Sequence, residues 1–263
     1  MEEYKNILIG TNMYYADWNI ALNKINKKNI IICNFTNLDE VKNIILCNNI
    51  DYILPLSIKD YDLIKTYCLE LGCNIKIIYP SKETAELLNN KNLFTEFMLK
   101  NYNEYIPDIY YLNNIKLKEI EYPAIYKPIY STNGTNIVII HNNNDFLNLK
   151  NHNNIQKYIE DEYEYGAYMV CIDGIIINCK IIRCKYNNFN IKINNFQDNY
   201  EIVEHFDIKI FENILNTLNY SGGICIDFKF NELTNKLYIF EINPRFGGSA
   251  FTLNFIYELL CIK

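Results

Sequence analysis

The sequence lacks the features that would place it in a membrane or in an oxidising compartment. No apolar run approaches the roughly 18 residues of a membrane span, and the polar start at residues 1–5 gives no sign of a signal peptide. Nine cysteines are scattered without a Cys-x-x-Cys pair, which argues against a zinc site or a disulfide framework. We therefore expect a cytoplasmic protein whose buried thiols stay reduced.

Several enzyme motifs are missing as well. The formal net charge of −6 makes the whole chain a poor nucleic-acid binder, although a local site for an anionic ligand is still compatible with it. Gly10 stands alone after the first strand-like run and forms no dinucleotide-binding fingerprint. A Walker P-loop is absent, and no Ser-His-Asp or Cys-His spacing points to a nucleophilic side chain. We expect structural or surface roles for the three isolated histidines.

The first 80 residues alternate apolar strand-like runs with helical patterns. The runs lie at 6–10, 29–33, 51–56 and 74–79, and the helical patterns lie at 16–27, 38–47 and 60–71. This alternation predicts a parallel sheet with helices on its faces. Ligands of such sheets usually bind beyond the carboxyl ends of the strands, so 10–18 and 56–60 are a candidate site edge, with ordinary loops as an equal alternative.

From residue 122 the pattern changes to paired strands. Strand-like runs at 122–128 and 136–141 flank a polar loop with Lys127 at its base. Backbone N–H groups of such a loop can wrap phosphate oxygens, so the hairpin is either a phosphate flap or a plain surface hairpin. Lys91 lies near the start of a helix at 91–101, where open N–H groups attract phosphate, although a surface lysine is the commoner interpretation.

The C-terminal strand ends in a cluster of polar residues. On an extended strand Glu241 and Asn243 point to the same face, and their oxygens suit Mg²⁺. A short loop at 232–236 would bring Asp227 of the preceding strand opposite Glu241. Three oxygen donors on one face are costly without a cation between them, which predicts a divalent-cation site. Arg245 follows, with a guanidinium shaped to hold phosphate or carboxylate oxygens.

Four motifs in this order resemble the ATP-grasp superfamily, and the last most resembles its carbamoyl-phosphate-synthase-like branch. They are Lys127-Pro128 before a polar loop, Gln156-Lys157-Tyr158-Ile159 before an acidic turn, Asp227 fourteen residues before Glu241, and Glu-Ile-Asn-Pro-Arg-Phe-Gly-Gly from Glu241. The resemblance implies an α/β and α+β fold, in which a Rossmann-like domain precedes an ATP-grasp fold of two α+β lobes. The implied parts are 1–80 (Rossmann-like), 81–120 (helical linker and start of the grasp), 121–160 (small lobe with flap) and 161–263 (C-terminal lobe with metal site).

The resemblance also implies a role for each motif residue. Lys91 and Lys127 match the lysines that bind the ATP phosphates, and Arg245 matches the arginine that holds the transferred phosphate or acyl phosphate. Catalytic roles are expected for Arg245 and Lys127. The other matches are Ser131 and Gly134 in the flap; Gln156, Lys157, Tyr158 and Ile159 in the adenine hinge; Glu162, which we favour, or Glu164 at the ribose; and Asp227, Glu241 and Asn243 at the metal. Arg183 is a candidate for binding a substrate carboxylate, with a plain surface charge as the alternative.

The implied chemistry is an ADP-forming ligation. A small-molecule carboxylate is phosphorylated to an acyl phosphate, and an amine then attacks it to give an amide. The implied cofactors are ATP and two Mg²⁺ ions, with Mn²⁺ as a substitute, and the implied partners are the two small substrates. We expect neither nucleic acid nor membrane as a partner, and a homodimer is expected only because dimers are the commonest oligomers. Two alternatives stay open: an inactive nucleotide-binding scaffold or regulatory protein, and a bicarbonate-activating carboxylase or carbamoylase.

Overall fold

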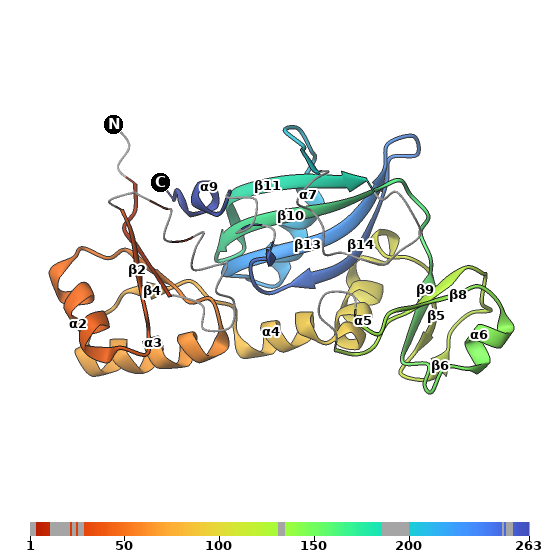
Figure 1. Cartoon of the computed structure of the whole chain (residues 1–263), viewed down its shortest axis with the longest axis horizontal. Coiled ribbons are helices and arrows are strands. Elements are labelled where there is room, and N and C mark those ends of the chain that lie inside the picture. The colour runs from red at the N-terminus through yellow and green to blue at the C-terminus, as the bar shows by residue number, and fades with distance from the viewer. Residues whose placement is uncertain are drawn as a thin grey trace.

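The computed structural model describes residues 4–10, 22, 25, 29–130, 135–185, 200–248, 250 and 255–262 of the 263-residue chain. Three sheets follow one another along the longest axis (Figure 1). The N-terminal sheet lies at one end, the largest sheet lies in the middle, and a small sheet lies at the other end. Helices α4 (Lys82–Asn89) and α5 (Lys91–Asn101) run beneath the middle and lead to the small sheet.

The N-terminal sheet is parallel throughout, as the strand–helix alternation predicts. Its order is β2-β1-β3-β4, with β1 at Ile7–Gly10, β2 at Ile30–Cys33, β3 at Tyr52–Leu54 and β4 at Lys76–Ile77. Its helices include α2 (Leu38–Cys47) and α3 (Ile58–Leu71). Helix α3 ends at Gly72, whose φ of 62° is left-handed and suits glycine. The helix expected at 16–27 falls almost wholly outside the described residues.

Side-chain caps separate the two linker helices. Ser81 accepts a hydrogen bond from the N–H of Thr84 and starts α4, as its type predicts. Asn90 accepts from the N–H groups of Asn92 and Leu93 and starts α5. Lys91 is therefore the first residue of α5, where the sequence placed it. A short 3-10 turn, η1 (Asn103–Tyr105), follows the helix.

The small sheet is antiparallel, and its first strand lies in the predicted part 81–120, the helical linker and start of the grasp. Its order is β6-β5-β9-β7-β8, with β5 at Ile109–Leu112, β6 at Ile115–Lys116, β7 at Ala124–Tyr126, β8 at Val138–Ile140 and β9 at Asn154–Lys157. Helix α6 (Asn143–Leu147) lies beside β8. Ala124, Ile140 and Ile155 are fully buried and form the centre of this lobe.

The large sheet is also antiparallel and carries the C-terminal polar cluster. Its order is β12-β11-β10-β13-β14, with β10 at Tyr163–Ile172, β11 at Ile175–Lys185, β12 at Tyr200–Ile202, β13 at Gly222–Asn231 and β14 at Lys236–Asn243. One face packs on α4, α5 and α7 (Lys209–Thr217). The other face packs on α9 (Ile256–Leu260) and on the N-terminal sheet. Asp173 and Gly174, both at positive φ, form the turn of the hairpin between β10 and β11.

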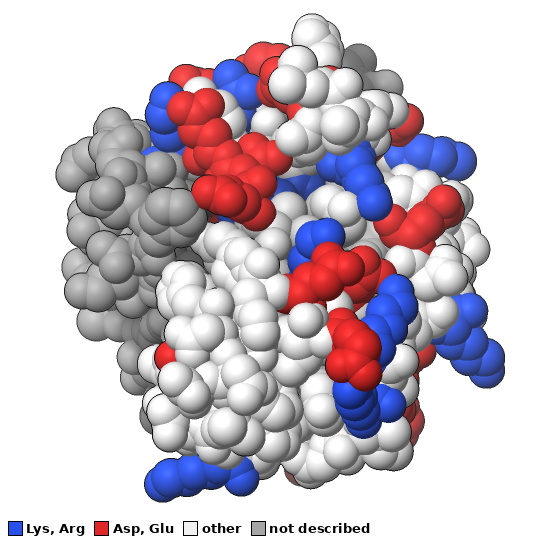
Figure 2. Space-filling view, turned by 90° about the vertical axis from the view of Figure 1, so that its right-hand side faces the viewer, with Lys and Arg blue, Asp and Glu red and all other residues white. Residues whose placement is uncertain are grey.

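The surface shows no single-sign field on the end of the molecule that Figure 2 presents. Basic and acidic side chains lie interspersed there among the described residues, unlike the continuous basic surface of a nucleic-acid binder (Figure 2). Among the described residues, none of the helices combines the length and apolar character needed to cross a bilayer.

Candidate active site

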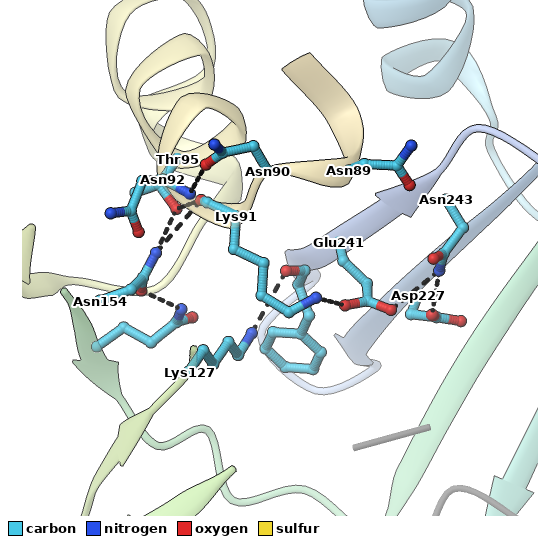
Figure 3. A network of polar contacts seen from close by, with 12 residues as sticks. Asn89, Asn90, Lys91, Asn92, Thr95, Lys127, Asn154, Asp227, Glu241 and Asn243 are labelled. Atoms are coloured by element: carbon cyan, nitrogen blue, oxygen red, sulfur yellow. Dashed lines mark hydrogen bonds and ion pairs between the residues drawn. The ribbon is translucent and has the colours of Figure 1, made fainter. Parts of the chain in front are cut away.

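The pairing of β13 with β14 brings the three predicted metal ligands together. Asp227 lies opposite Glu241, as the loop length predicts, and Cys225 lies opposite Asn243. Asn243 Nδ2 donates to Asp227 Oδ2 at 3.1 Å and to Glu241 Oε1 at 2.9 Å. Figure 3 shows the two carboxylates and the amide turned toward one another. Since carboxylate and amide oxygens are the donors that Mg²⁺ prefers, the set fits a divalent cation.

Two buried lysines reach this cluster from separate elements. Lys91, at the start of α5, is 6% exposed, and its Nζ lies 2.5 Å from Glu241 Oε2. Lys127, just after β7, is also 6% exposed and donates from Nζ to the carbonyl of Phe240 at 3.3 Å. Its ammonium lies 4.9 Å from the centroid of the Phe240 ring. The linker helix, the small lobe and the large sheet therefore all contribute charge to one place (Figure 3).

The charges of the cluster are unevenly satisfied. Burial alone would raise the pKa of Glu241, but the charge and hydrogen bond of Lys91 and the hydrogen bond from Asn243 hold that pKa at about 2. Burial, followed by the charges of Glu241 and Glu164, raises the pKa of Asp227 well above its usual range. Lys91 thus compensates the charge of Glu241 and leaves the charge of Asp227 uncompensated. A bound cation would compensate it.

Lys127 is balanced between burial and nearby acids. Burial lowers the pKa of Lys127 to about 8, and Lys91 acts in the same direction, whereas Glu241, Glu164 and Asp227 oppose the shift. A further negative charge, such as that of phosphate, would favour the charged form of this lysine.

A buried polar chain supports the start of α5. Asn154 in β9 is fully buried and donates from Nδ2 to Thr95 Oγ1 at 2.9 Å and to the Lys91 carbonyl at 3.3 Å. Gln156 Nε2 donates to Asn154 Oδ1 at 3.1 Å. These contacts fix α5 against β9 and thereby orient Lys91 towards Glu241. Asn154 was not predicted as a site residue, because its partners lie some 60 positions earlier in the chain.

The predicted adenine hinge is the connection between the small and large sheets. Lys157 ends β9 and pairs with Glu121 at 3.3 Å, while the N–H of Tyr158 donates to the Pro123 carbonyl at 3.2 Å. Ile159 follows and leads into the turn before β10. The structure thus places these residues between the two lobes.

The two candidate ribose glutamates differ in their surroundings. Glu162 is exposed and forms an ion pair with Lys185. Glu164, in β10, is half-buried, and burial raises its pKa against the opposing charges of Lys229 and Lys127. Glu164 therefore belongs to the charge cluster, whereas Glu162 pairs with Lys185.

Arg245 lies at the boundary between the large sheet and the N-terminal sheet. Its Nη1 donates to Asn89 Oδ1, the last residue of α4, at 3.1 Å. It lines a small depression beside the carboxyl ends of β3 and β4. The other lining residues are Pro55, Leu56, Tyr79, Pro80, Gly223, Pro244 and Phe246. Leu56 thus lies where the sequence placed a candidate site edge.

Arg183 lies on the other face of the large sheet from Asp227. It pairs with Tyr165 across β10 and β11, and Tyr165 in turn pairs with Phe228. Its guanidinium bonds Glu201 and Glu232, each at 2.7 Å. These contacts give no support to a substrate role for Arg183, which stays a prediction.

The middle of the predicted flap, including Ser131 and Gly134, lies outside the described residues. The chain just before it is tied to the linker helices. Ile129 accepts a hydrogen bond from the N–H of Lys91 at 2.9 Å, and Tyr130 bonds Glu86 through its hydroxyl at 2.6 Å. The start of the flap is thereby anchored beside the two buried lysines.

Comparison with known proteins adds an independent line of information. Residues 88–249, more than half of the chain, match the ATP-grasp domain. The chain is 26% identical over 237 residues to the carbamoyl phosphate synthase large chain of Methanobrevibacter smithii, an alignment that covers 80% of this chain and 22% of that protein. It is 31% identical over 159 residues to a D-alanine–D-alanine ligase of Wolbachia pipientis wMel, covering 54% of this chain and 48% of that enzyme.

The fold comparison agrees with the sequence comparison. The crystal structure of D-alanine–D-alanine ligase from Bacillus anthracis complexed with ATP matches with a TM-score of 0.53 and 15% identity, over 98% of this chain and 95% of that one. The chain spans less than half the length of the two sequence relatives. The shared fold and the extent of the domain match lead to one conclusion: this chain belongs to the ATP-grasp family.

Proposed function

We propose that this chain is an ATP-dependent carboxylate–amine ligase that works through an acyl phosphate. One observation carries the proposal: lysines from two separate elements and three oxygen-bearing side chains form a single cluster at the junction of the lobes. A site of this kind suits phosphoryl transfer, in which catalysis comes mainly from positioning and from neutralising charge on phosphate oxygens.

The cluster divides into two parts in the proposed ATP complex. Lys91 and Lys127 bind phosphate oxygens, while Asp227, Glu241 and Asn243 would hold Mg²⁺. The chemistry that Mg²⁺ would supply when held there is neutralisation of charge on the phosphate oxygens; we propose two ions, with Mn²⁺ as a substitute. Lys91 now pairs with Glu241, so phosphate and metal together would take over the charges that these two residues satisfy for each other.

The remaining contacts follow the connection between the lobes. In the proposal, residues 156–159 contact the adenine, and Ser131 and Gly134 close over the phosphates. Glu164 is preferred to Glu162 at the ribose, because Glu164 lies among the site charges and Glu162 pairs with Lys185. Arg245 lies at the boundary with the N-terminal sheet, where its guanidinium would hold the transferred phosphate of the acyl phosphate.

The reaction has two steps in this proposal. An oxygen of the substrate carboxylate attacks the γ-phosphorus of ATP, the bond from that phosphorus to the bridging oxygen breaks, and ADP leaves. The nitrogen of an amine then attacks the acyl carbon, phosphate leaves, and the nitrogen loses a proton to give the amide. Lys127 and Arg245 hold the phosphoryl oxygens through both steps.

A bicarbonate-activating reaction is the second candidate, because the alignment with a carbamoyl phosphate synthase covers 80% of the chain. Bicarbonate would replace the substrate carboxylate in the first step and give carboxyphosphate. An assay of ADP release separates the two proposals, since only the bicarbonate-activating reaction gives ADP release that depends on bicarbonate. An inactive nucleotide-binding protein would release no ADP with any acid.

The test is ADP release from Mg·ATP across pools of carboxylic acids and amines, with bicarbonate as a separate arm. We expect continuous ADP release over many turnovers to require both an acid and an amine, because the amine must remove the acyl group before the next cycle. Lys127→Met should reduce it at least ~100-fold, because the variant removes a phosphate-binding charge from a buried site. Lys116→Met changes an exposed lysine of the same lobe and should leave the rate unchanged. Tight ATP binding without ADP release in any pool would contradict the ligase proposal.

A further inference from the structure

A buried lysine that the proposed chemistry does not use lies two residues after Asp227. Lys229 is on the same face of β13 as Asp227, because side chains alternate along a strand, and it is 8% exposed. Its Nζ donates to the backbone carbonyls of Ile159 at 2.8 Å and Asp161 at 3.4 Å. A buried ammonium is costly unless it is well partnered, so these partners indicate what the residue does.

Both carbonyls belong to the connection that carries the chain from the small sheet to the large sheet (Figure 1). The small lobe holds this connection through the N–H of Tyr158, which donates to the Pro123 carbonyl at 3.2 Å. Lys229 holds the next residue, Ile159, from the large lobe. The connection is thus tied to one lobe at residue 158 and to the other lobe at residue 159.

Two further contacts hold the connection to β13, as the hydrogen bonds of Lys229 do. Asn231, the next residue on that face of β13, donates from Nδ2 to Asp161 Oδ2 at 3.3 Å. The ammonium of Lys229 also lies 5.6 Å from the centroid of the Tyr158 ring, within the range of a cation–π contact. The strand that carries Asp227 therefore holds residues 158–161 by a hydrogen-bonded lysine, an amide and a ring contact.

We propose that Lys229 is a positioning residue for the nucleotide, which fixes the nucleobase-binding connection relative to the metal ligand Asp227. The inference rests on the proposed function, in which residues 156–159 contact the adenine. Strand β13 would then position both ends of the nucleotide. It would hold the phosphates through the metal at Asp227 and the base through Lys229. Loss of Lys229 should weaken binding of the base and leave binding of the phosphates intact.

The test compares ATP with inorganic tripolyphosphate, which offers phosphates without a base. Titration calorimetry with Mg²⁺ gives both dissociation constants for the wild type and for Lys229→Met. We expect the variant to bind ATP ~10-fold more weakly and to bind tripolyphosphate within about twofold of the wild type. Lys236→Met is the matched control, since Lys236 is an exposed lysine at the start of β14 whose Nζ lies 4.9 Å from the ring centroid of Tyr238 on the same strand. It should change neither constant.

A second measurement reports on the connection itself. Hydrogen exchange at the amides of residues 158–161 should be faster in Lys229→Met than in the wild type, and Lys229→Arg should recover part of the ATP affinity because it keeps a buried donor. If Lys229→Met does not fold, Asn231→Ala decides instead, with a selective loss of ATP affinity of ~3-fold expected.

Three results would overturn the inference. Equal weakening of ATP binding and tripolyphosphate binding in Lys229→Met would mean a general loss of structure. An unchanged ATP affinity would mean that the hydrogen bonds of Lys229 do not affect binding of the base. In both cases the proposed ligase function would stand. A wild-type protein that binds tripolyphosphate but not ATP would overturn the proposed function, and this inference with it.

Discussion

At the scale of single residues, side-chain alternation along strands was sufficient to find the metal-site candidates. Glu241 and Asn243 share a face because they are two apart, and the short loop between the strands brings Asp227 opposite Glu241. The same rule places Lys229 two residues from Asp227, but nothing local shows that its partners are carbonyls near residue 160. Contacts between distant segments were therefore the part of the site that could not be predicted.

Asp227→Asn tests the electrostatics of the cluster without breaking an ion pair. Because the folded-state pKa of Asp227 is raised, the folded protein binds more protons than the unfolded chain, and this acid costs stability as pH rises above its unfolded value of about 3.9. The asparagine variant lacks this cost. Without divalent cations, the free energy of unfolding of the variant should exceed that of the wild type by an amount that is absent below about pH 4 and grows as pH rises. Urea unfolding from pH 3 to 8 measures it.

A stability advantage of Asp227→Asn that shrinks as pH rises would contradict a raised pKa of Asp227.

Glu241→Gln is a less suitable variant for this purpose, since it would leave the buried ammonium of Lys91 without its carboxylate. Removing one partner of a buried pair usually costs ~3–5 kcal/mol, and that loss would obscure the effect of a single acid.

At the scale of elements, local signals predicted caps and helix starts better than they predicted burial. Helix α5 begins at Lys91, as expected, and Ser81, a residue type that favours helix starts, caps α4. Without the family resemblance, the sequence favoured a surface position for Lys91. Its side chain is nevertheless 6% exposed, because the small lobe and β14 cover the start of α5. Strand β5 (Ile109–Leu112) falls in the predicted part 81–120, the helical linker and start of the grasp, and no strand was predicted there, because its partner β9 lies some 40 residues later.

Gly223 shows how one element controls the geometry of the next. A Cβ at Gly223 in β13 would lie 2.6 Å from the buried ring of Phe246, the residue after Arg245. Gly223→Ala should therefore lower the free energy of unfolding by about 1–3 kcal/mol and weaken ATP binding, because the ring and the adjoining arginine must move. Denaturant unfolding and calorimetry measure the two effects.

Gly72→Ala is the control for this substitution. Gly72 ends α3 at a φ of 62° with open space around its Cα, so alanine there costs about 1–2 kcal/mol through backbone conformation alone. Its ATP affinity should match that of the wild type. If Gly223→Ala were as stable as the wild type, the close packing of Phe246 against β13 would be wrong.

At the scale of the whole molecule, the candidate site exists only where the parts of the chain meet. Lys91 comes from the linker helix, Lys127 from the small lobe, and Asp227 and Glu241 from the large sheet (Figure 3). The N-terminal sheet shares a hydrophobic cluster with one face of the large sheet and meets it again beside Arg245. The order of motifs in the sequence predicted this assembly through a family resemblance, and periodicity alone would have predicted only its separate sheets.

In the proposed function, this junction binds ATP through a divalent cation held by Asp227, Glu241 and Asn243. Calorimetric titration of ATP into the wild type and Asp227→Asn, each with and without Mg²⁺, tests it most directly. We expect Mg²⁺ to tighten ATP binding at least ~10-fold in the wild type and to have little effect in the variant, which stays folded. Equal Mg²⁺ dependence in both proteins would contradict the claim.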